Sequence, residues 1–334
     1  MTRKGSVMLL RIMAVSFVLA FTPAAFALDG KIVHVKLATK NVPGPIDIAI
    51  YTPPGYDAKR ATPYPLIVQL HGGNGASENM TTMAEPLEQA IKSGLVPAAV
   101  SVMPSASRSF YMDYRDGSQM WETFVITDLL GHMRSGYNVP KTREGTLITG
   151  ISMGGMGSMR IALKHPDIFQ AVASMEPGIE PALEFKDIKL RDRFYRDQAL
   201  FEEKFGKPVD EAFWAANNPA SIVAKDPGRL KDLGIYLEVG DQDMFFLDQG
   251  AEFLHRALFD SGVAHEYRLV RGGDHVGPSI IPRFIDAMSY FGRVLNPPIW
   301  INDKVIAARG QIDAMKRKAG YPVKPIDPQH VHAE

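Results

Sequence analysis

Short apolar runs bounded by glycine or proline recur along this chain, with helix-like stretches between most of them. Apolar strands that alternate with helices are typical of a mostly parallel sheet with helices on both faces. Glu266–Val270 is predicted as the last strand and Pro282–Val294 as the last helix. We therefore expect the α/β fold class. The earlier predicted strands are Leu66–Leu70, Ala98–Val102, Thr146–Thr149, Ala171–Ser174 and Ile235–Val239, and the clearest helices between them are Met120–Met133 and Gly155–Lys164.

The start of the predicted domain has a different pattern. Lys31–Leu37 and Ile46–Tyr51 alternate polar and apolar residues, as half-buried strands do. Pro53, Pro54 and Gly55 then interrupt the chain. These two segments predict an antiparallel N-terminal edge to the sheet.

Two later segments do not alternate between strand and helix. Residues from about 180 to 233 are charged and aromatic with no clear strand, which predicts an insertion over one end of the sheet. Residues 296–334 are rich in proline and lysine and predict a tail with one helix, Lys304–Lys318. The main domain is thus expected to span residues 28–295.

The first 27 residues have the pattern of a secretory signal peptide. Arg3 and Lys4 precede a short apolar stretch, and Ala25-Phe26-Ala27 provides a small-x-small cleavage site. The alternative is an uncleaved anchor helix, but the apolar stretch is short for a membrane span and Arg11 interrupts it. We expect a periplasmic or secreted protein that is not held at a membrane after cleavage.

Composition argues against several classes of partner and site. Lys plus Arg and Asp plus Glu number 37 each, so charge gives no reason to expect nucleic acid or an anionic membrane as a partner. The chain has no cysteine, which excludes a thiol nucleophile, a cysteine-ligated zinc site and an iron–sulfur cluster. We find no His-x-x-x-His pattern and no acidic ligand cluster, and predict neither a metal nor another cofactor.

Ser152 lies between Gly150 and Gly154, where a predicted strand ends and a helix begins. A sharp strand-to-helix turn exposes a serine above a sheet and requires small residues two positions before and after it. Gly-x-Ser-x-Gly is a weak signal by itself, and an ordinary glycine turn is the alternative. The motif predicts that Ser152 is a nucleophile if a base lies within hydrogen-bonding reach.

The loop His71-Gly72-Gly73-Asn74-Gly75 directly follows the strand Leu66–Leu70. In sheets of this type, this loop and the residue after the serine present backbone N–H groups to a developing oxyanion. We predict that Gly73 and Met153 supply these donors, although a turn that merely requires glycine would look the same. His71 is expected to orient the loop rather than to take part in chemistry.

Candidate acid and base residues follow the last two predicted strands. Asp241 and Asp243 come after Ile235–Val239, and we favour Asp243 because it lies further past the strand and can reach the next loop. Either acid could instead cap its loop. His275 is the histidine after Asp243 that lies in a glycine loop following a terminal strand. The order serine, aspartate, histidine predicts a triad of Ser152, Asp243 and His275.

From about Tyr51 to Leu295 the chain resembles the putative esterase family of α/β-hydrolases. That family includes feruloyl and acetylxylan esterases, S-formylglutathione hydrolases, enterochelin esterases and mycolyltransferases. The resemblance implies an α/β-hydrolase fold and assigns the catalytic roles to Ser152, Asp243 and His275. Tyr111 and Trp121 are candidates for the substrate pocket, but such aromatic residues more often belong to the core. The matching segments are Ser109–Tyr114, Trp121–Phe124, Gly150–Gly155, Leu163–Asp167, Phe205-Gly206, Asn217–Pro219, Gly240–Asp243 and Gly272–His275.

These observations predict a serine esterase that hydrolyses small-molecule or carbohydrate-linked carboxylic esters through an acyl-enzyme. The cytosolic location of S-formylglutathione hydrolases disagrees with an export signal, which argues against that thioester as the substrate. An acyltransferase on the same fold and a non-catalytic ligand-binding protein remain as alternatives. Peptidase activity ranks below them, because the resemblance is to the esterase branch.

Overall fold

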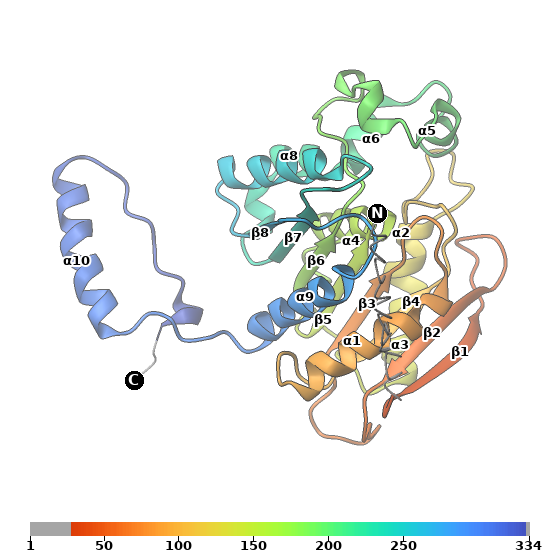
Figure 1. Ribbon diagram of the computed structural model, residues 1–334, viewed down its shortest axis with the longest axis horizontal. Coiled ribbons are helices and arrows are strands. Elements are labelled where there is room, and N and C mark those ends of the chain that lie inside the picture. The colour runs from red at the N-terminus through yellow and green to blue at the C-terminus, as the bar shows by residue number, and fades with distance from the viewer. Residues whose placement is uncertain (1–27, 332–334) are drawn as a thin grey trace, which may run out of the picture.

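The computed structural model describes residues 28–331, and the predicted signal peptide, residues 1–27, lies outside them. A single eight-stranded sheet forms the centre of the fold, in the order β1-β2-β4-β3-β5-β6-β7-β8 (Figure 1). β2 runs antiparallel to both of its neighbours, and all other pairs are parallel. The expected α/β class and the antiparallel N-terminal edge are therefore confirmed. The strands are β1 (Lys31–Leu37), β2 (Ile46–Thr52), β3 (Leu66–Leu70), β4 (Val100–Pro104), β5 (Thr146–Ile151), β6 (Ala171–Met175), β7 (Gly234–Gly240) and β8 (Glu266–Val270).

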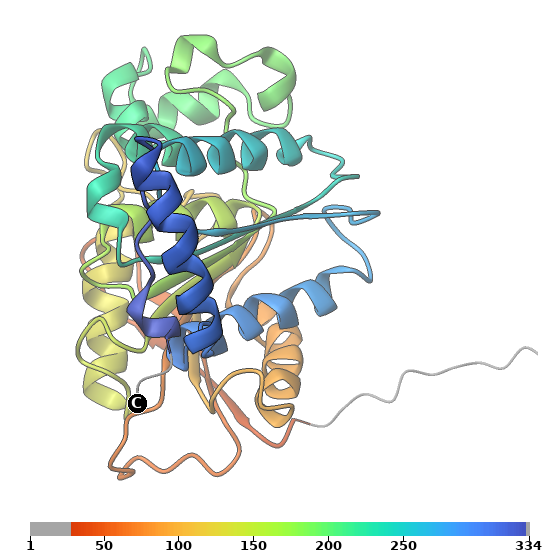
Figure 2. The same cartoon turned by 90° about the vertical axis from the view of Figure 1, so that its left-hand side faces the viewer.

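Helices cover both faces of the sheet. α1 and α9 pack against each other on one face, and α4 and α8 lie on the opposite face together with the helical segment α2–α3 (Figure 2). This layering explains the apolar runs in the sequence, because strands covered on both sides bury every side chain. The helices are α1 (Met80–Lys92), α2 (Trp121–Thr123), α3 (Leu130–Gly136), α4 (Met153–Lys164), α5 (Gln198–Phe205), α6 (Glu211–Asn217), α7 (Pro219–Lys225), α8 (Leu247–Asp260), α9 (Ile280–Leu295) and α10 (Asp303–Lys318).

The apolar side chains form two buried layers, one on each face of the sheet. On β2, Ile48 and Ile50 face one layer while Ala49 and Tyr51 face the other, as the period-two geometry of a strand requires. The layer with Ile48 packs against α2–α3, α4 and α8, and the layer with Tyr51 packs against α1 and α9. The sheet is thereby held on both sides, and its strand ends provide a rigid platform.

Two predicted elements differ from the structure in detail. β4 begins at Val100 rather than Ala98, because it pairs with Leu66 at the start of β3 and continues to Pro104 opposite Ile48 of β2. The helix predicted over Met120–Met133 is present, but a π-helical turn over residues 124–129 separates α2 from α3. Apolar spacing alone gives no signal for that extra residue per turn.

The segment between β6 and β7 contains helices α5, α6 and α7 and no strand. Asp197 caps α5 by accepting a hydrogen bond from the Leu200 N–H, and Asp210 caps α6 through the Phe213 N–H. In Figure 1 this segment lies at the top of the molecule, beyond the ends of the strands. Residues 180–233 lie within this segment, and their assignment as an insertion stays a prediction.

The C-terminal segment leaves the body of the fold after α9. Figure 1 shows α10 standing apart from the sheet, and none of its side chains is buried. The chain returns beside Ile301, where Val331 forms a β-bridge, and Trp300 stacks on His330. Among residues 28–331, no helix has both the length and the apolar character needed to cross a membrane.

Candidate active site

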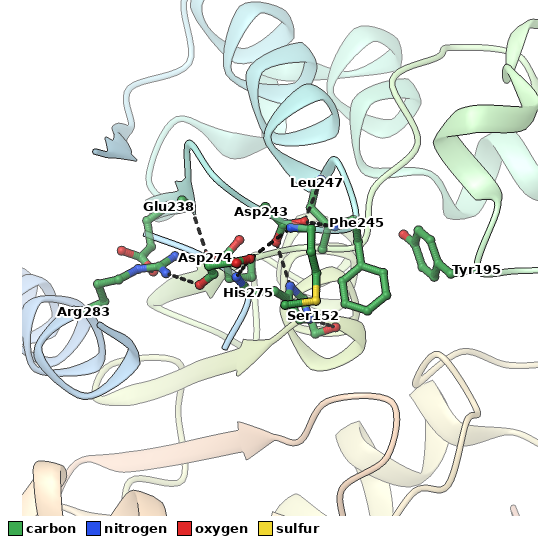
Figure 3. Close-up of polar contacts among 12 residues, drawn as sticks. Ser152, Tyr195, Glu238, Asp243, Phe245, Leu247, Asp274, His275 and Arg283 are labelled. Carbon is green, nitrogen blue, oxygen red and sulfur yellow. Dashed lines mark hydrogen bonds and ion pairs between the residues drawn. The ribbon is translucent and has the colours of Figure 1, made fainter. Parts of the chain in front are cut away.

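The predicted site residues come together at the carboxyl ends of neighbouring strands. Ser152 follows β5, Asp243 lies in the loop after β7, and His275 lies in the loop after β8. β7 and β8 are adjacent, and β6 alone lies between β5 and β7, so the loops after these strands meet above one edge of the sheet. Figure 3 shows the three side chains pointing toward one another.

Ser152 occupies a strained turn between β5 and α4. Its φ of 60° and ψ of −116° place a non-glycine residue in a sparsely populated region, which costs on the order of 1–3 kcal/mol. A Cβ on Gly154 would lie 2.0 Å from the Leu70 carbonyl oxygen, and one on Gly150 would lie 2.3 Å from the Gly154 oxygen. The two glycines are therefore required by close backbone packing, as the motif predicts.

A continuous chain of hydrogen bonds links the three side chains. Ser152 Oγ lies 3.0 Å from His275 Nε2, and His275 Nδ1 lies 2.7 Å from Asp243 Oδ2. Because Asp243 accepts from Nδ1, Nε2 is left free to accept the serine proton. Asp243 Oδ1 accepts from the N–H groups of Phe245 at 2.7 Å and Leu247 at 3.1 Å. Burial would raise the pKa of Asp243, but hydrogen bonds that include those from His275 and the Leu247 N–H hold it below its ordinary value.

Asp241, the competing acid, lies elsewhere in the same loop. Its Oδ1 accepts a hydrogen bond from the Gly272 N–H at 2.6 Å, and the side chain is partly exposed. Asp241 therefore caps the loop after β8, whereas Asp243 contacts His275. Of the two candidate acids, the structure places Asp243 next to His275, and its catalytic role stays a prediction.

The loop after β3 lies beside the serine. Gly73 and Met153 both line the cavity that contains Ser152. Met153 is the first residue of α4, where a backbone N–H has no intrahelical acceptor. His71 Nε2 accepts from the Ala106 N–H at 2.9 Å, so its proton lies on Nδ1, which is 2.7 Å from the Gly72 oxygen. His71 holds the loop in place, and burial lowers its pKa.

A cavity of about 640 Å³ opens at this site. Aromatic side chains at its wall include Phe110, Tyr195 and Phe245, and the Phe245 ring lies edge-on to the His275 imidazole with centroids 4.7 Å apart. Sequence analysis did not identify these residues. Phe110 lies within the matching segment Ser109–Tyr114 and Phe245 follows Gly240–Asp243 closely, but nothing in the sequence brings Tyr195 to this place.

The two aromatic pocket candidates lie in the core instead. Tyr111 is fully buried and donates a hydrogen bond to the His71 oxygen, and Trp121 is 5% exposed. Neither residue lines the cavity. Phe110, the residue before Tyr111, lines the cavity instead, and both residues have positive φ angles.

Glu176, which sequence analysis missed, lies behind Asp243. Among the described residues, Glu176, Asp243 and His275 are the group whose oxygen and nitrogen atoms come close enough to hold a metal ion. However, Arg283 pairs with Glu176, and Asp243 is hydrogen-bonded to His275, so a cation would have to displace these contacts. The signal that could have identified Glu176 is its place directly after a predicted strand at the same edge of the sheet.

Comparison with known proteins relates this geometry to a family. The family model described as Putative esterase matches residues 39–285. The chain is 25% identical to an S-formylglutathione hydrolase from Paracoccus denitrificans, over 69% of this chain and 82% of that protein. It is 23% identical to the diacylglycerol acyltransferase/mycolyltransferase Ag85B from Mycobacterium avium, over 52% of this chain and 55% of that protein. A third relative, the diacylglycerol acyltransferase/mycolyltransferase Ag85A from Mycobacterium leprae, is matched over only 27% of its length.

A solved structure described as a ferulic acid esterase superposes with a TM-score of 0.65 at 21% identity, covering 80% of this chain and 100% of that one. This likeness shows that the sheet and its helices form an α/β-hydrolase fold. The family model covers most of the domain and includes the loops that carry Ser152, Asp243 and His275. The chain therefore belongs to the esterase family.

Proposed function

We propose that this protein is an exported serine esterase that hydrolyses carboxylic esters through Ser152, His275 and Asp243. The observation that carries the proposal is the hydrogen-bond chain from Ser152 Oγ to His275 and on to Asp243, at the wall of a cavity. Each contact has the direction that nucleophilic catalysis needs. His275 can accept the proton of the Ser152 hydroxyl, and Asp243 fixes the tautomer of the imidazole.

The reaction proceeds in two steps. Ser152 Oγ attacks the ester carbonyl as its proton passes to His275 Nε2, and the alcohol then leaves with that proton. Water, activated by the same nitrogen, hydrolyses the acyl-enzyme and regenerates the serine. The N–H groups of Gly73 and Met153 stabilise the oxyanion in each tetrahedral intermediate. Asp243 stays ionised and stabilises the imidazolium, as its lowered pKa requires.

The substrate class follows from the wall of the cavity. Phe110, Tyr195, Phe245 and Met156 present apolar surface near Ser152, which favours an ester with an aromatic or aliphatic acyl group. The similar proteins include a ferulic acid esterase and an S-formylglutathione hydrolase, whose names refer to an aromatic acid and to a formyl thioester. The alcohol part can be a small molecule or a carbohydrate.

The test is a Ser152→Ala variant of the mature protein. We expect hydrolysis of aryl, acetyl and feruloyl esters to fall by a factor of about 10⁴ or more. Wild-type protein should also react covalently with a fluorophosphonate, and the variant should not. Full esterase activity in Ser152→Ala would reject the assignment, and thermal denaturation would show whether the variant is folded.

Export is a separate part of the proposal. It rests on the signal-peptide pattern of residues 1–27. Fractionation of expressing cells followed by N-terminal sequencing tests it, and we expect a periplasmic or secreted protein that begins at Leu28. An intact N-terminus in the cytosolic fraction would contradict it.

An acyltransferase is the second candidate, favoured by the similarity to a mycolyltransferase. In that reaction an alcohol replaces water in the second step. Product analysis with and without an added alcohol acceptor separates the two reactions. A non-catalytic ligand-binding protein would bind ester analogues but fail to react with the fluorophosphonate.

A further inference from the structure

A second buried carboxyl group lies directly behind the proposed triad. Glu176 follows β6, and its side chain is fully buried. Oε1 accepts a hydrogen bond from the Gly240 N–H at 3.0 Å and also pairs with Arg283 of α9. The backbone N–H of Glu176 donates to the backbone carbonyl oxygen of Glu238 at 2.9 Å. These contacts hold Glu176 rigidly on the side of Asp243 that faces away from the substrate cavity.

The other carboxylate oxygen of Glu176 has no ordinary donor. Within the described part of the chain, Oε2 is buried and without a hydrogen-bond partner if the group is ionised. The Asp243 carboxylate is its neighbour, and atoms of Glu176, Asp243 and His275 lie within 4.8 Å of one another. Two ionised carboxylates this close in a buried site repel each other strongly. A proton on Glu176 removes the repulsion and gives both groups a hydrogen bond.

The surrounding charges favour that proton. Arg283 lies between Glu176 and Glu238, and one guanidinium can neutralise only one of the two carboxylates. Burial, together with contact with Asp243, raises the pKa of Glu176 to about 8, and burial raises the pKa of Glu238 to about 7. The neighbouring Asp243 carboxylate contributes to the raised pKa of Glu176. The titratable and charged groups around this site are Arg283 of α9, Glu238 of β7, Asp243 and His275 of the adjoining loops, and, behind Glu238, Arg268 of β8 and Asp286 of α9.

We propose that Glu176 is a positioning residue of the site, protonated at neutral pH, whose carboxyl group donates a hydrogen bond to Asp243 and so fixes the carboxylate that orients His275. The inference rests on the proposed function, in which Asp243 and His275 serve Ser152. Glu176 does not line the cavity and therefore acts only through Asp243. Figure 3 shows Glu238 and Arg283 on one side of the triad, with Phe245 and Tyr195 on the other.

This arrangement makes the reaction sensitive to alkali. When Glu176 loses its proton, Asp243 loses a donor and gains a negative neighbour. Arg283 and the Gly240 N–H hold Glu176 in place, so Asp243 must shift and pull His275 out of line with Ser152. We expect kcat of the wild type to fall at least about threefold between about pH 7 and pH 9.

Glu176→Gln tests the assignment. The amide keeps an oxygen for Arg283 and Gly240 and supplies a permanent donor to Asp243, so kcat should stay near the wild-type value at pH 7 and remain level up to about pH 9. The hydrolysis rate of Ser152→Ala serves as the blank at each pH. A Glu176→Gln profile that follows the wild-type fall would overturn the inference, as would a level wild-type profile.

Glu238→Gln is the matched control. Glu238 is equally buried and pairs with the same Arg283, but among the described residues no hydrogen bond joins it to Asp243. In Glu238→Gln, Arg283 pairs with Glu176 alone and stabilises its ionised form. The alkaline fall in kcat should therefore move to lower pH and not vanish. If the alkaline fall in kcat disappears in Glu238→Gln but remains in Glu176→Gln, the titrating group is Glu238 and the proposal is refuted.

Infrared difference spectroscopy gives a second measurement that does not depend on activity. In Glu238→Gln, the carbonyl stretch of a protonated carboxylic acid should disappear as the pH rises, and its absence throughout would overturn the inference. The two proposals fail separately. Activity in Ser152→Ala would remove the proposed function, whereas an inactive Ser152→Ala together with an unchanged Glu176→Gln profile would remove only the role of Glu176.

Discussion

The contacts of Asp243 predict how Asp243→Asn would inactivate the protein. Asp243 Oδ1 accepts from two backbone donors, the N–H groups of Phe245 and Leu247. An amide nitrogen cannot accept from them, so the asparagine oxygen must take this position and its NH₂ must face His275. His275 Nδ1 then has to accept, which moves the imidazole proton to Nε2. That nitrogen would donate to Ser152 Oγ and could no longer take its proton.

The expected loss is large because the variant favours the wrong tautomer without altering the fold. An equivalent exchange in a Ser-His-Asp triad lowers kcat about 10⁴-fold, which corresponds to about 5 kcal/mol of activation free energy. Initial rates with an aryl ester measure the effect. Asp241→Asn is the matched control, because Asp241 lies in the same loop but bonds to Gly272, and its kcat should change less than about threefold. A folded Asp243→Asn with more than about a tenth of wild-type kcat would refute the reasoning.

Two other substitutions and one truncation test the turn, the cavity and the tail. Gly154→Ala places a Cβ 2.0 Å from the Leu70 oxygen, so we expect a destabilisation of several kcal/mol, seen as a large fall in Tm or as insoluble protein, and a normal Tm would contradict the packing argument. Tyr195→Ala should raise KM for aryl esters several-fold with kcat within about threefold, and a loss confined to kcat would show that Tyr195 acts on the chemistry. Ending the chain after Pro298 removes α10, which has no buried side chain, so Tm should change by about 2 °C or less; a larger fall would show that the tail supports the domain.

Much of the fold follows from local pattern. Strands with apolar side chains on both faces have to be covered by helices, so Leu66–Leu70 and the other runs predict both the sheet and its layers. The candidate nucleophile could be predicted as well, because its role depends on a local shape, the turn that places Ser152 between two glycines. Asp243 and His275 could be assigned because each follows a strand of predictable order.

The remaining features depend on contacts between distant segments. Glu176 and Arg283 are far apart in the sequence, and only the packing of α9 against the sheet brings them together. Tyr195 reaches the cavity from an insertion that has no strand to fix its direction. Phe110 and Tyr111 both belong to the core and have positive φ angles, yet only Phe110 of the two also lines the cavity. No periodicity in the sequence encodes these placements.

The position of the insertion has a consequence for how such a protein diversifies. Tyr195 and Arg196 reach the cavity from the stretch between β6 and β7, whereas the proposed nucleophile, base and acid follow the ends of strands. In the proposed mechanism, substrate recognition and catalysis therefore depend on separate segments of the chain. One wall can be rebuilt by exchange of a single contiguous stretch, while the reactive groups keep the support of the sheet.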